Sequence, residues 1–385
     1  MIRKTLLRGV VLLLSVPLAQ GQRTLDYDNV VVPQNRIDAR DLGYPPIDVI
    51  PDGESAITSL TVAPTGKLYG ATSGKRSHLF VLNPRHGYVQ PLGFLPGTTA
   101  VTNALVVSAA GDVYIGTSPG GHLLKYTPHQ EDSQPLRVKE PCEVTDLGPA
   151  IPGESILTLA IDRSAETIYG LTSPNAHFFK FALPVGRFTD LGVVARRGPE
   201  GEKFETGKTV SRMLALDPKG NVYASGEDAY FYKFDKEKQT LQKLPVRAPA
   251  IPGREPWTRV DAILANSTGP IFGATSDGYL FRFDPERLVV HNLGKPLLHY
   301  RITGLVLAPN GTIYGVGGDD DDMARLFSYD VGNGAFEILG FVDVNRRPYY
   351  TWQAHVIKAM AVGLDGTIYI GESERISRLY LFYPW

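Results

Sequence analysis

The sequence predicts an all-β fold, a seven-bladed β-propeller, from a recurring phrase, the composition and two matching fragments at opposite ends of the chain. The phrase consists of short β-rich runs separated by turns, and it returns at roughly 40–55 residues, the spacing typical of propeller blades. The 40 Gly, 29 Pro and 10% aromatic residues fit a turn-rich β protein with an ordinary apolar content. The copies of the phrase lie at 68–84, 113–128, 168–184, 222–237, 271–286, 313–331 and 368–385.

Each repeat divides into four expected strands. In the first repeat the first strand covers 60–63, and the second and third strands contain Tyr69-Gly70 and His78-Leu79-Phe80. The turn at 64–66 supplies the Pro and Gly that a tight hairpin needs. The fourth strand is marked by a Leu-Gly pair, with copies at 90–93, 145–148, 189–192, 291–294 and 337–340 and a weaker one at 242–245.

The two ends of the chain complement each other. The seventh repeat stops after its third strand, and an isolated fourth-strand motif stands near the N-terminus at 40–43. We therefore expect residues 37–45 to pair with 376–384 as the outer strand of the last blade, which removes both open edges of the ring.

One aromatic residue recurs in every expected second strand. An aromatic side chain that returns once per repeat is predicted to pack between blades. The positions are Tyr69, Tyr114, Tyr169, Tyr223, Phe272, Tyr314 and Tyr369.

The N-terminus has the pattern of a secretory signal peptide over residues 1–21. Basic Arg3 and Lys4 precede an apolar stretch at 9–18, and Ala19-Gln20-Gly21 is a small-x-small cleavage site. We expect residues 22–385 to form one propeller domain in a secreted or periplasmic protein that is not embedded in a membrane.

Charge and motifs exclude several function classes. The net charge is −1 with both signs mixed, which gives no support for nucleic-acid binding. The single Cys142 cannot form an intrachain disulfide. We expect the protein to be a monomer without a cofactor or a catalytic metal. The acidic run 319–322 is interpreted as a solvated loop because it lacks the alternating spacing of calcium loops. A structural calcium or zinc ion stays open as an alternative.

Two positions repeat around the ring on the face where propellers usually bind ligands. The first lies at the start of each third strand and holds His78, His122, His177, Tyr230, Tyr279, Arg325 and Arg378. Packing positions are normally apolar, so this set indicates either a functional ring or polar side chains that cap the blade edges by hydrogen bonds.

The second position lies eleven residues before each second-strand aromatic. There the sequence has Thr58, Asn103, Thr158, Arg212, Asp261, Thr303 and Lys358, which predicts a polar channel mouth. Neighbouring loops add Arg259 and Arg301 beside Trp257 and Tyr300. Arginine binds carboxylates through its planar fork and aromatic rings stack on sugars, so this combination favours an anionic carbohydrate. The expected substrate-binding residues are Arg212, Arg259, Arg301, Tyr279, Trp257, Tyr300, His78 and Asn103.

The repeats with Tyr-Gly-x-Thr-Ser-Pro-x-x-His-Leu character resemble propeller polysaccharide lyases, the ulvan lyases and related rhamnose–glucuronate lyases, over residues from about 37 to 385. The resemblance implies β-elimination next to a uronate, with His and Tyr transferring protons and Arg neutralising the carboxylate. It implies His177, Tyr230 and His122 as catalytic residues. The family's second His, about twenty residues upstream, has no counterpart here.

Three functions therefore remain for the sequence. The leading one is a secreted lyase that cleaves an anionic, uronate-containing polysaccharide. A glycoside hydrolase would need a carboxylate pair, for which Asp261 and Glu154 are the candidates. A non-catalytic propeller that binds a glycan or a protein is the third.

Overall fold

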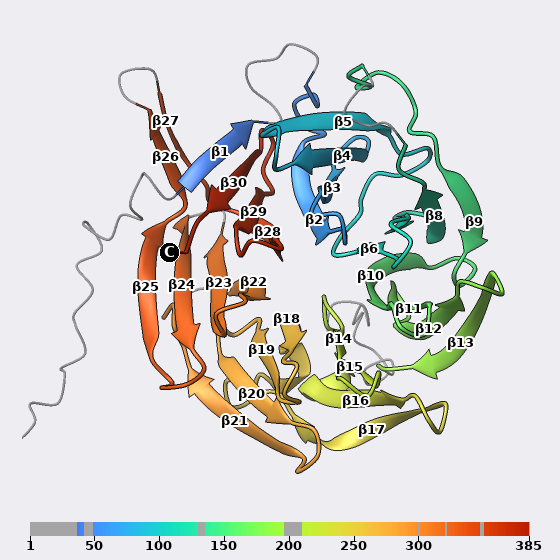
Figure 1. Ribbon diagram of the computed structural model, residues 1–385. Helices are drawn as coiled ribbons and strands as arrows, with labels where there is room; N and C mark the ends of the chain where they lie inside the picture. Colours follow the sequence, from blue (N-terminus) through green and yellow to red (C-terminus); the bar gives the residue numbers. More distant parts are fainter. Residues whose placement is uncertain are drawn as a thin grey trace, which may run out of the picture. The chain divides into compact units, whose positions relative to one another are not determined.

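The structure is a computed structural model that describes residues 37–41, 49–129, 135–195, 210–298, 301–319, 322–346 and 350–384. This part of the chain contains seven four-stranded antiparallel sheets arranged as the blades of a β-propeller (Figure 1). The predicted fold class is confirmed. The expected signal peptide, residues 1–21, lies outside the described residues.

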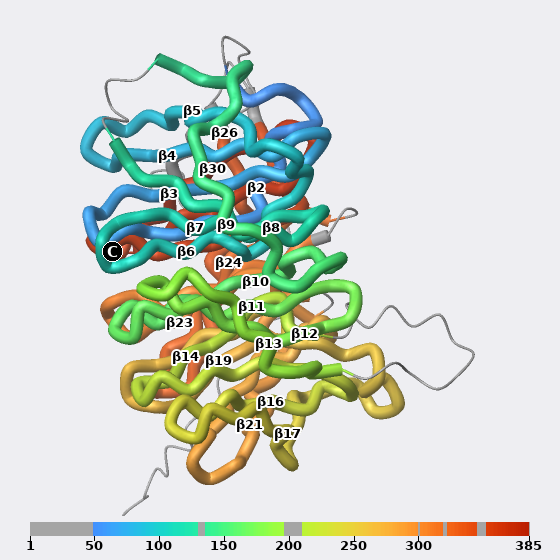
Figure 2. The backbone as a smooth tube through the Cα atoms, turned by 90° about the vertical axis from the view of Figure 1, so that its right-hand side faces the viewer, coloured from blue at the N-terminus to red at the C-terminus, as the bar shows by residue number. Residues whose placement is uncertain are grey.

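Each blade starts at the centre of the ring and ends at its rim (Figure 1), and the side view of Figure 2 shows successive blades following one another in chain order. We number the blades along the chain. Blade 1 consists of β2 (Ala56–Val62), β3 (Leu68–Ser73), β4 (His78–Asn83) and β5 (Tyr88–Phe94), and blade 2 of β6 (Leu105–Val107), β7 (Val113–Gly116), β8 (His122–Tyr126) and β9 (Thr145–Pro149). Blade 3 consists of β10 (Ser155–Asp162), β11 (Thr167–Ser173), β12 (His177–Ala182) and β13 (Arg187–Val193). Blade 4 consists of β14 (Ala215–Leu216), β15 (Val222–Ser225), β16 (Tyr230–Asp235) and β17 (Thr240–Arg247).

The remaining blades complete the ring, and blade 7 takes its outer strand from the N-terminal part of the chain. Blade 5 consists of β18 (Val260–Ala265), β19 (Ile271–Thr275), β20 (Leu280–Asp284) and β21 (Val289–Gly294). Blade 6 consists of β22 (Ile302–Leu307), β23 (Thr312–Asp319), β24 (Asp322–Asp330) and β25 (Phe336–Phe341). Blade 7 consists of β28 (Ile357–Val362), β29 (Ile368–Glu372), β30 (Arg378–Phe382) and β1 (Ile37–Asp41).

Smaller elements lie in the connections between these strands. A hairpin of β26 (Asp343–Arg346) and β27 (Tyr350–Gln353) stands between blades 6 and 7. Two 3-10 turns, η4 (Glu227–Ala229) and η5 (Glu255–Trp257), precede β16 and β18.

The predicted closing strand is confirmed. Strand β1 pairs antiparallel with β30, from Ile37 opposite Phe382 to Asp41 opposite Arg378. The outer strand of blade 7 thus comes from a segment far away in the sequence, and it pairs with the edge of β30 that would otherwise be open.

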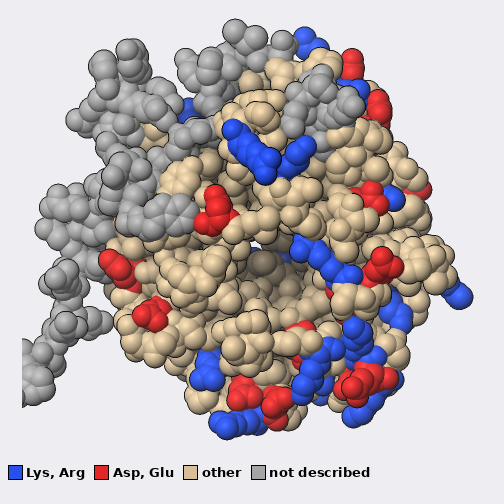
Figure 3. All heavy atoms as spheres, in the orientation of Figure 1, with Lys and Arg blue, Asp and Glu red and all other residues tan. Residues whose placement is uncertain are grey.

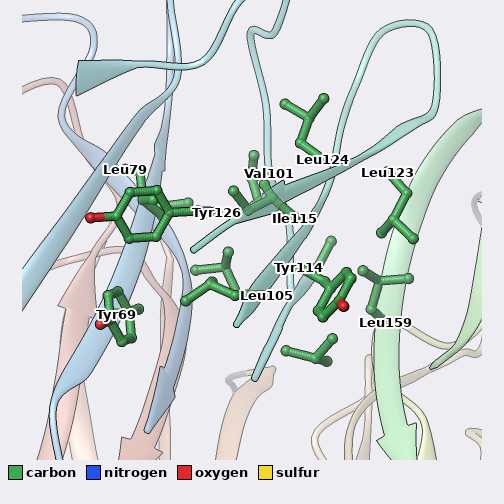
Figure 4. Close-up of a cluster of buried hydrophobic side chains, with 14 of the residues drawn as sticks. Tyr69, Leu79, Val101, Leu105, Tyr114, Ile115, Leu123, Leu124, Tyr126 and Leu159 are labelled. Carbon is green, nitrogen blue, oxygen red and sulfur yellow. The ribbon is translucent and has the colours of Figure 1, made fainter. Parts of the chain in front are cut away.

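The recurring aromatics pack between blades, as predicted. Tyr69 of blade 1 lies 6.3 Å from Tyr126 of blade 2, measured between ring centroids (Figure 4). The same relation repeats between the second strand of one blade and the third strand of the next. The further pairs are Tyr169–Phe234, Tyr223–Phe283, Phe272–Tyr329 and Tyr314–Phe382, at 5.5 to 6.3 Å.

The glycine that follows the recurring aromatic residue is needed for a different reason. Gly70 faces the ring of Phe80 on the adjacent strand, and a Cβ at Gly70 would lie 2.0 Å from Phe80 Cζ. Four blades share this arrangement of a second-strand glycine under a third-strand phenylalanine. The pairs are Gly70–Phe80, Gly170–Phe179, Gly273–Phe281 and Gly315–Phe327. The glycine therefore makes room for a buried ring, rather than providing backbone freedom.

Candidate anion-binding site

Three arginines from successive blades meet around one buried carboxylate. Arg212 precedes β14, Arg259 and Asp261 flank the start of β18, and Arg301 immediately precedes β22. Arg259 Nε donates to Asp261 Oδ1 at 2.6 Å. Arg301 donates to Asp261 Oδ2 through Nε at 2.9 Å and Nη2 at 2.8 Å. We call these four residues the arginine cluster.

The arginine cluster has more positive than negative charge. Asp261 is only 3% exposed, and it is the one acidic member beside three guanidinium groups. Burial, together with the charges of Arg259 and Arg301, lowers the pKa of Arg212 to about 10. Among the described residues, no carboxylate forms an ion pair with Arg212. Of its four described members, the cluster thus has three with positive charge and one with negative charge, which favours an anionic ligand.

The backbone of neighbouring blades fixes this geometry. Strand β18 has a bulge in which Val260 pairs with Thr275 and Ala262 with Ala274, so Asp261 is left without a partner on β19. The Arg212 backbone N–H donates to Val260 O at 3.0 Å, which ties blade 4 to blade 5 at the cluster. A bulge of this kind redirects a side chain out of the regular alternation of a strand.

A second carboxylate, missed by the sequence interpretation, holds the loop that carries Trp257 and Arg259. Asp277 accepts hydrogen bonds from Thr258 Oγ1 at 2.6 Å and from the Ile251 backbone at 3.1 Å. Its side chain is 2% exposed. The position of Asp277 in the sequence could have indicated this role. Asp277 lies in the loop before the third strand of blade 5, from which an acidic side chain can reach the loop that precedes the first strand.

The expected aromatic and polar neighbours of the cluster have different surroundings. Trp257 is 54% exposed on η5, two residues before Arg259. Tyr279 lies under Lys295, with Nζ 4.5 Å from the ring centroid. Asn103 adopts a left-handed conformation with φ of 46° and belongs to blade 2, whereas the cluster is built by blades 4 to 6. Tyr300 lies outside the described residues.

The expected ring of seven polar residues needs one correction. The turn between β10 and β11 is one residue longer than in the other blades, since Ala160 pairs with Tyr169 while Thr61 pairs with Tyr69. The residue that corresponds to Thr58 is therefore the apolar Leu157 and not Thr158. Thr58 itself is buried and donates to Val101 O at 2.6 Å, so it joins two blades instead of facing an open channel.

The ring at the start of the third strands contacts the outer strands. His122 Nδ1 lies 2.8 Å from Asp146 Oδ2, and His177 Nδ1 lies 2.9 Å from Asp190 Oδ2, each within its own blade. Tyr230 lies under Lys243, with Nζ 4.3 Å from the ring centroid. These contacts point outward from β8, β12 and β16, whereas the arginine cluster forms at the inner strands. The structure therefore brings the three arginines together and places the three expected catalytic residues in separate contacts.

His78 is corrected as a substrate-binding residue. It is fully buried, and its Nε2 lies 2.7 Å from Glu54 Oε2. Burial is also the main reason why its pKa lies below the ordinary value. A ligand cannot reach a side chain without exposed surface, so His78 has a structural role.

The carboxylate pair expected for a hydrolase is not assembled. Glu154 is 4% exposed and accepts hydrogen bonds from Thr172 Oγ1 at 3.1 Å and the Asn175 backbone at 2.9 Å. Asp261 is occupied by Arg259 and Arg301, in another blade. Each carboxylate holds its own part of the framework, so the hydrolase alternative loses its two acid–base groups.

Other chemistry is sparse in the part of the chain that the structure describes. No group of three or more His, Cys, Asp or Glu side chains there is arranged to hold a metal ion. In the acidic run, Asp322 forms an ion pair with Arg325 at 3.4 Å, and residues 320–321 lie outside the described ranges. Cys142 is a buried free thiol. Within the same ranges, no helix has the length and hydrophobicity of a membrane span.

Comparisons with known proteins identify the class of fold. No family model matches the sequence, and no curated protein is significantly similar to it. A streptogramin B lyase structure is 14% identical with a TM-score of 0.64, covering 90% of this chain and 99% of that chain. A virginiamycin B lyase from Staphylococcus aureus is 10% identical with a TM-score of 0.64 and the same coverage.

A third similar structure is the extracellular domain of a putative hybrid two-component system from B. thetaiotaomicron, at 14% identity and a TM-score of 0.60. The similarity covers 89% of this chain but only 39% of that one. At such identities the likeness shows the fold alone. The chain is a seven-bladed β-propeller, and its activity has to be inferred from its own residues.

Proposed function

We propose that this protein is exported and binds an anionic, uronate-containing glycan at the arginine cluster. The single observation that supports the proposal is the grouping of Arg212, Arg259 and Arg301 around one buried carboxylate, three positive side chains beside one negative one. Exposed Trp257, two residues from Arg259, provides an aromatic surface of the kind that stacks on sugar rings.

The binding proposal is tested with a panel of uronate polysaccharides and their neutral counterparts. Arg212→Ala should weaken binding of the acidic glycans about tenfold or more, because a charged hydrogen bond contributes roughly 1.5–3 kcal/mol. Arg187→Ala, which removes an exposed arginine from β13 in blade 3, is the matched control and should bind normally. Equal binding of acidic and neutral glycans, or an unaffected Arg212→Ala variant, contradicts the proposal.

A second candidate function is polysaccharide lyase activity by β-elimination. In that reaction a base removes the C5 proton of the uronate, a C4–C5 double bond forms, the C4–O bond breaks, and an acid protonates the leaving oxygen. One observation favours it: Asp146 and Asp190 hold His122 and His177 through Nδ1, a bond that orients an imidazole so that Nε2 can exchange a proton.

The lyase candidate is tested by the absorbance of an unsaturated product. His177→Ala and Tyr230→Phe should each reduce turnover by about 10²–10⁴-fold, the usual contribution of a proton-transfer group, and leave glycan binding largely intact. His122→Ala is the third variant, for the second proton-transfer role. Undiminished turnover in both the His177 and the Tyr230 variants contradicts these roles. Binding without any turnover in the parent protein leaves the glycan-binding function.

A further inference from the structure

The loop that leads into the first strand of blade 5 is longer than its counterparts in blades 1 and 3. All three loops contain Ile-Pro followed by a turn glycine, and each ends at the bulge residue of the first strand. Between the glycine and the bulge residue lie four residues in blade 1 (Gly53 to Thr58), three in blade 3 (Gly153 to Leu157) and seven in blade 5 (Gly253 to Asp261). The longer stretch in blade 5 contains η5 and Trp257, which is 54% exposed.

Asp277 holds both ends of the segment 251–258, which we call the Trp257 loop. Its Oδ2 accepts hydrogen bonds from the Ile251 backbone N–H at 3.1 Å and from Thr258 Oγ1 at 2.6 Å. Between these two points, backbone hydrogen bonds close two consecutive turns. One oxygen of a side chain that is 2% exposed therefore fixes the first and the last residue of the Trp257 loop, and the turns fix the backbone between them.

Blade 7 contains a smaller form of the same arrangement. Glu374 lies two residues after the end of β29, as Asp277 lies two residues after the end of β19. Glu374 accepts the backbone N–H groups of His355 at 2.7 Å and Val356 at 3.2 Å. It thus holds two adjacent residues at the start of a strand, whereas Asp277 holds two residues at opposite ends of a loop.

We infer that Asp277 is a positioning residue that keeps the Trp257 loop in one conformation, so that Trp257 is presented beside Arg259 as a surface for a sugar ring. The inference rests on the proposed glycan-binding function. An aromatic side chain on a loose loop loses binding free energy because the loop has to be ordered when the sugar stacks on it. A loop that is already ordered avoids this loss.

The backbone of Arg259 has a support of its own. The Arg259 N–H donates to Ser276 Oγ at 3.2 Å, and its carbonyl oxygen accepts from the Ser276 backbone N–H at 2.9 Å. Neighbouring residues of one loop in blade 5 therefore hold the charged and the aromatic parts of the site separately. Loss of the Asp277 carboxylate should loosen Trp257 and leave the backbone bonds of Arg259 in place.

Fluorine NMR of protein labelled with 5-fluorotryptophan tests the positioning without any glycan. The chain has three tryptophans, and the resonance that disappears in Trp257→Ala belongs to Trp257. In Asp277→Asn this resonance should shift by more than its own width. Thr258→Val removes the hydroxyl that donates to Asp277 and should have the same effect, so it decides the question if Asp277→Asn does not fold. Glu374→Gln, the matched change in blade 7, should leave the resonance in place.

Calorimetric titration with the acidic glycan that binds most tightly tests the consequence for recognition. Trp257→Ala and Asp277→Asn should each weaken binding about two- to tenfold, the range of a single aromatic contact. In the double variant, binding should be no weaker than in Trp257→Ala alone, because Asp277 acts through Trp257. Glu374→Gln should bind like the parent protein.

An unchanged Trp257 resonance in both Asp277→Asn and Thr258→Val overturns the positioning role. An Asp277→Asn variant with parental affinity also overturns it, as does a loss of affinity that is equally large with and without Trp257, because the carboxylate then serves the fold alone. If no acidic glycan binds the parent protein, the proposed function is refuted, and the fluorine resonance still decides whether Asp277 positions Trp257.

Discussion

The glycine of the repeated Tyr-Gly pair should be intolerant of even one added methyl group. In Gly70→Ala the new Cβ would lie 2.0 Å from Phe80 Cζ, and both residues are in the closed interior of blade 1. Ordinary contact begins near 3.4 Å, so the ring has to retreat by about 1.4 Å into a packed core. Overpacking of this kind costs about 1–3 kcal/mol, whereas the lower entropy of an unfolded alanine recovers about 0.4–1 kcal/mol.

We therefore expect Gly70→Ala to reduce the free energy of unfolding by about 1.3 kcal/mol, the difference between the midpoints of those two ranges. Chemical denaturation followed by tryptophan fluorescence measures it. Because the cost comes from one ring, Gly70→Ala combined with Phe80→Leu should be more stable than the sum of the single changes predicts, with a coupling of about 1 kcal/mol.

The same set of single and double variants at Gly315 and Phe327 in blade 6 is an internal replicate. There a Cβ added at Gly315 would lie 2.3 Å from Phe327 Cζ. A neutral or stabilising Gly70→Ala, or strictly additive double variants in both blades, would show that the glycine is not there for the ring.

Further predictions concern titration, reactivity and ring closure. Burial raises the pKa of Glu372 to about 7 from 4.5. The folded protein then binds this proton more tightly than the unfolded chain does, so the free energy of unfolding should fall as pH rises from about 4.5 to 7. Thermal melts of Glu372→Gln should not show this decrease. Burial raises the pKa of the Cys142 thiol to about 12, so iodoacetamide should leave it unmodified in the native protein and alkylate it in denaturant. A chain that starts at residue 49 lacks β1, so it should unfold at a lower temperature and self-associate through the exposed edge of β30. Calorimetry measures the unfolding temperature and light scattering the self-association. A monomer with an unchanged unfolding temperature would contradict this prediction.

The sequence predicted most of the architecture, because a repeat compares its own copies. The blade count, the inter-blade aromatics and the pairing of β1 with β30 all follow from motifs that recur at matching positions. These features depend on local strand and turn chemistry, which is visible in the residues themselves.

The site was harder to predict, because it depends on which side chains meet across strands. The single extra residue in the turn before β11 displaced the alignment in blade 3 and substituted Thr158 for Leu157. The partners of His122 and His177 lie 24 and 13 residues further along the chain, because the connection from β8 to β9 is longer than that from β12 to β13, so a fixed offset could not identify them. The contacts of Asp261 with arginines of two blades could not be predicted, because Asp261 and Arg301 are 40 positions apart in the sequence.

The pairing of β1 with β30 has a consequence for the time at which the protein becomes complete. Residues 37–41 are made before blades 1 to 6, whereas their partners at 378–382 are made after those blades. Blades 1 to 6 each consist of strands adjacent in sequence and can form their hairpins as the chain emerges. The final blade instead awaits a contact between distant segments, which is slow to form because the intervening chain must first be ordered. Until then the partly folded chain exposes two unpaired edges, and this interval is when it is most open to chaperones, proteases and other copies of itself.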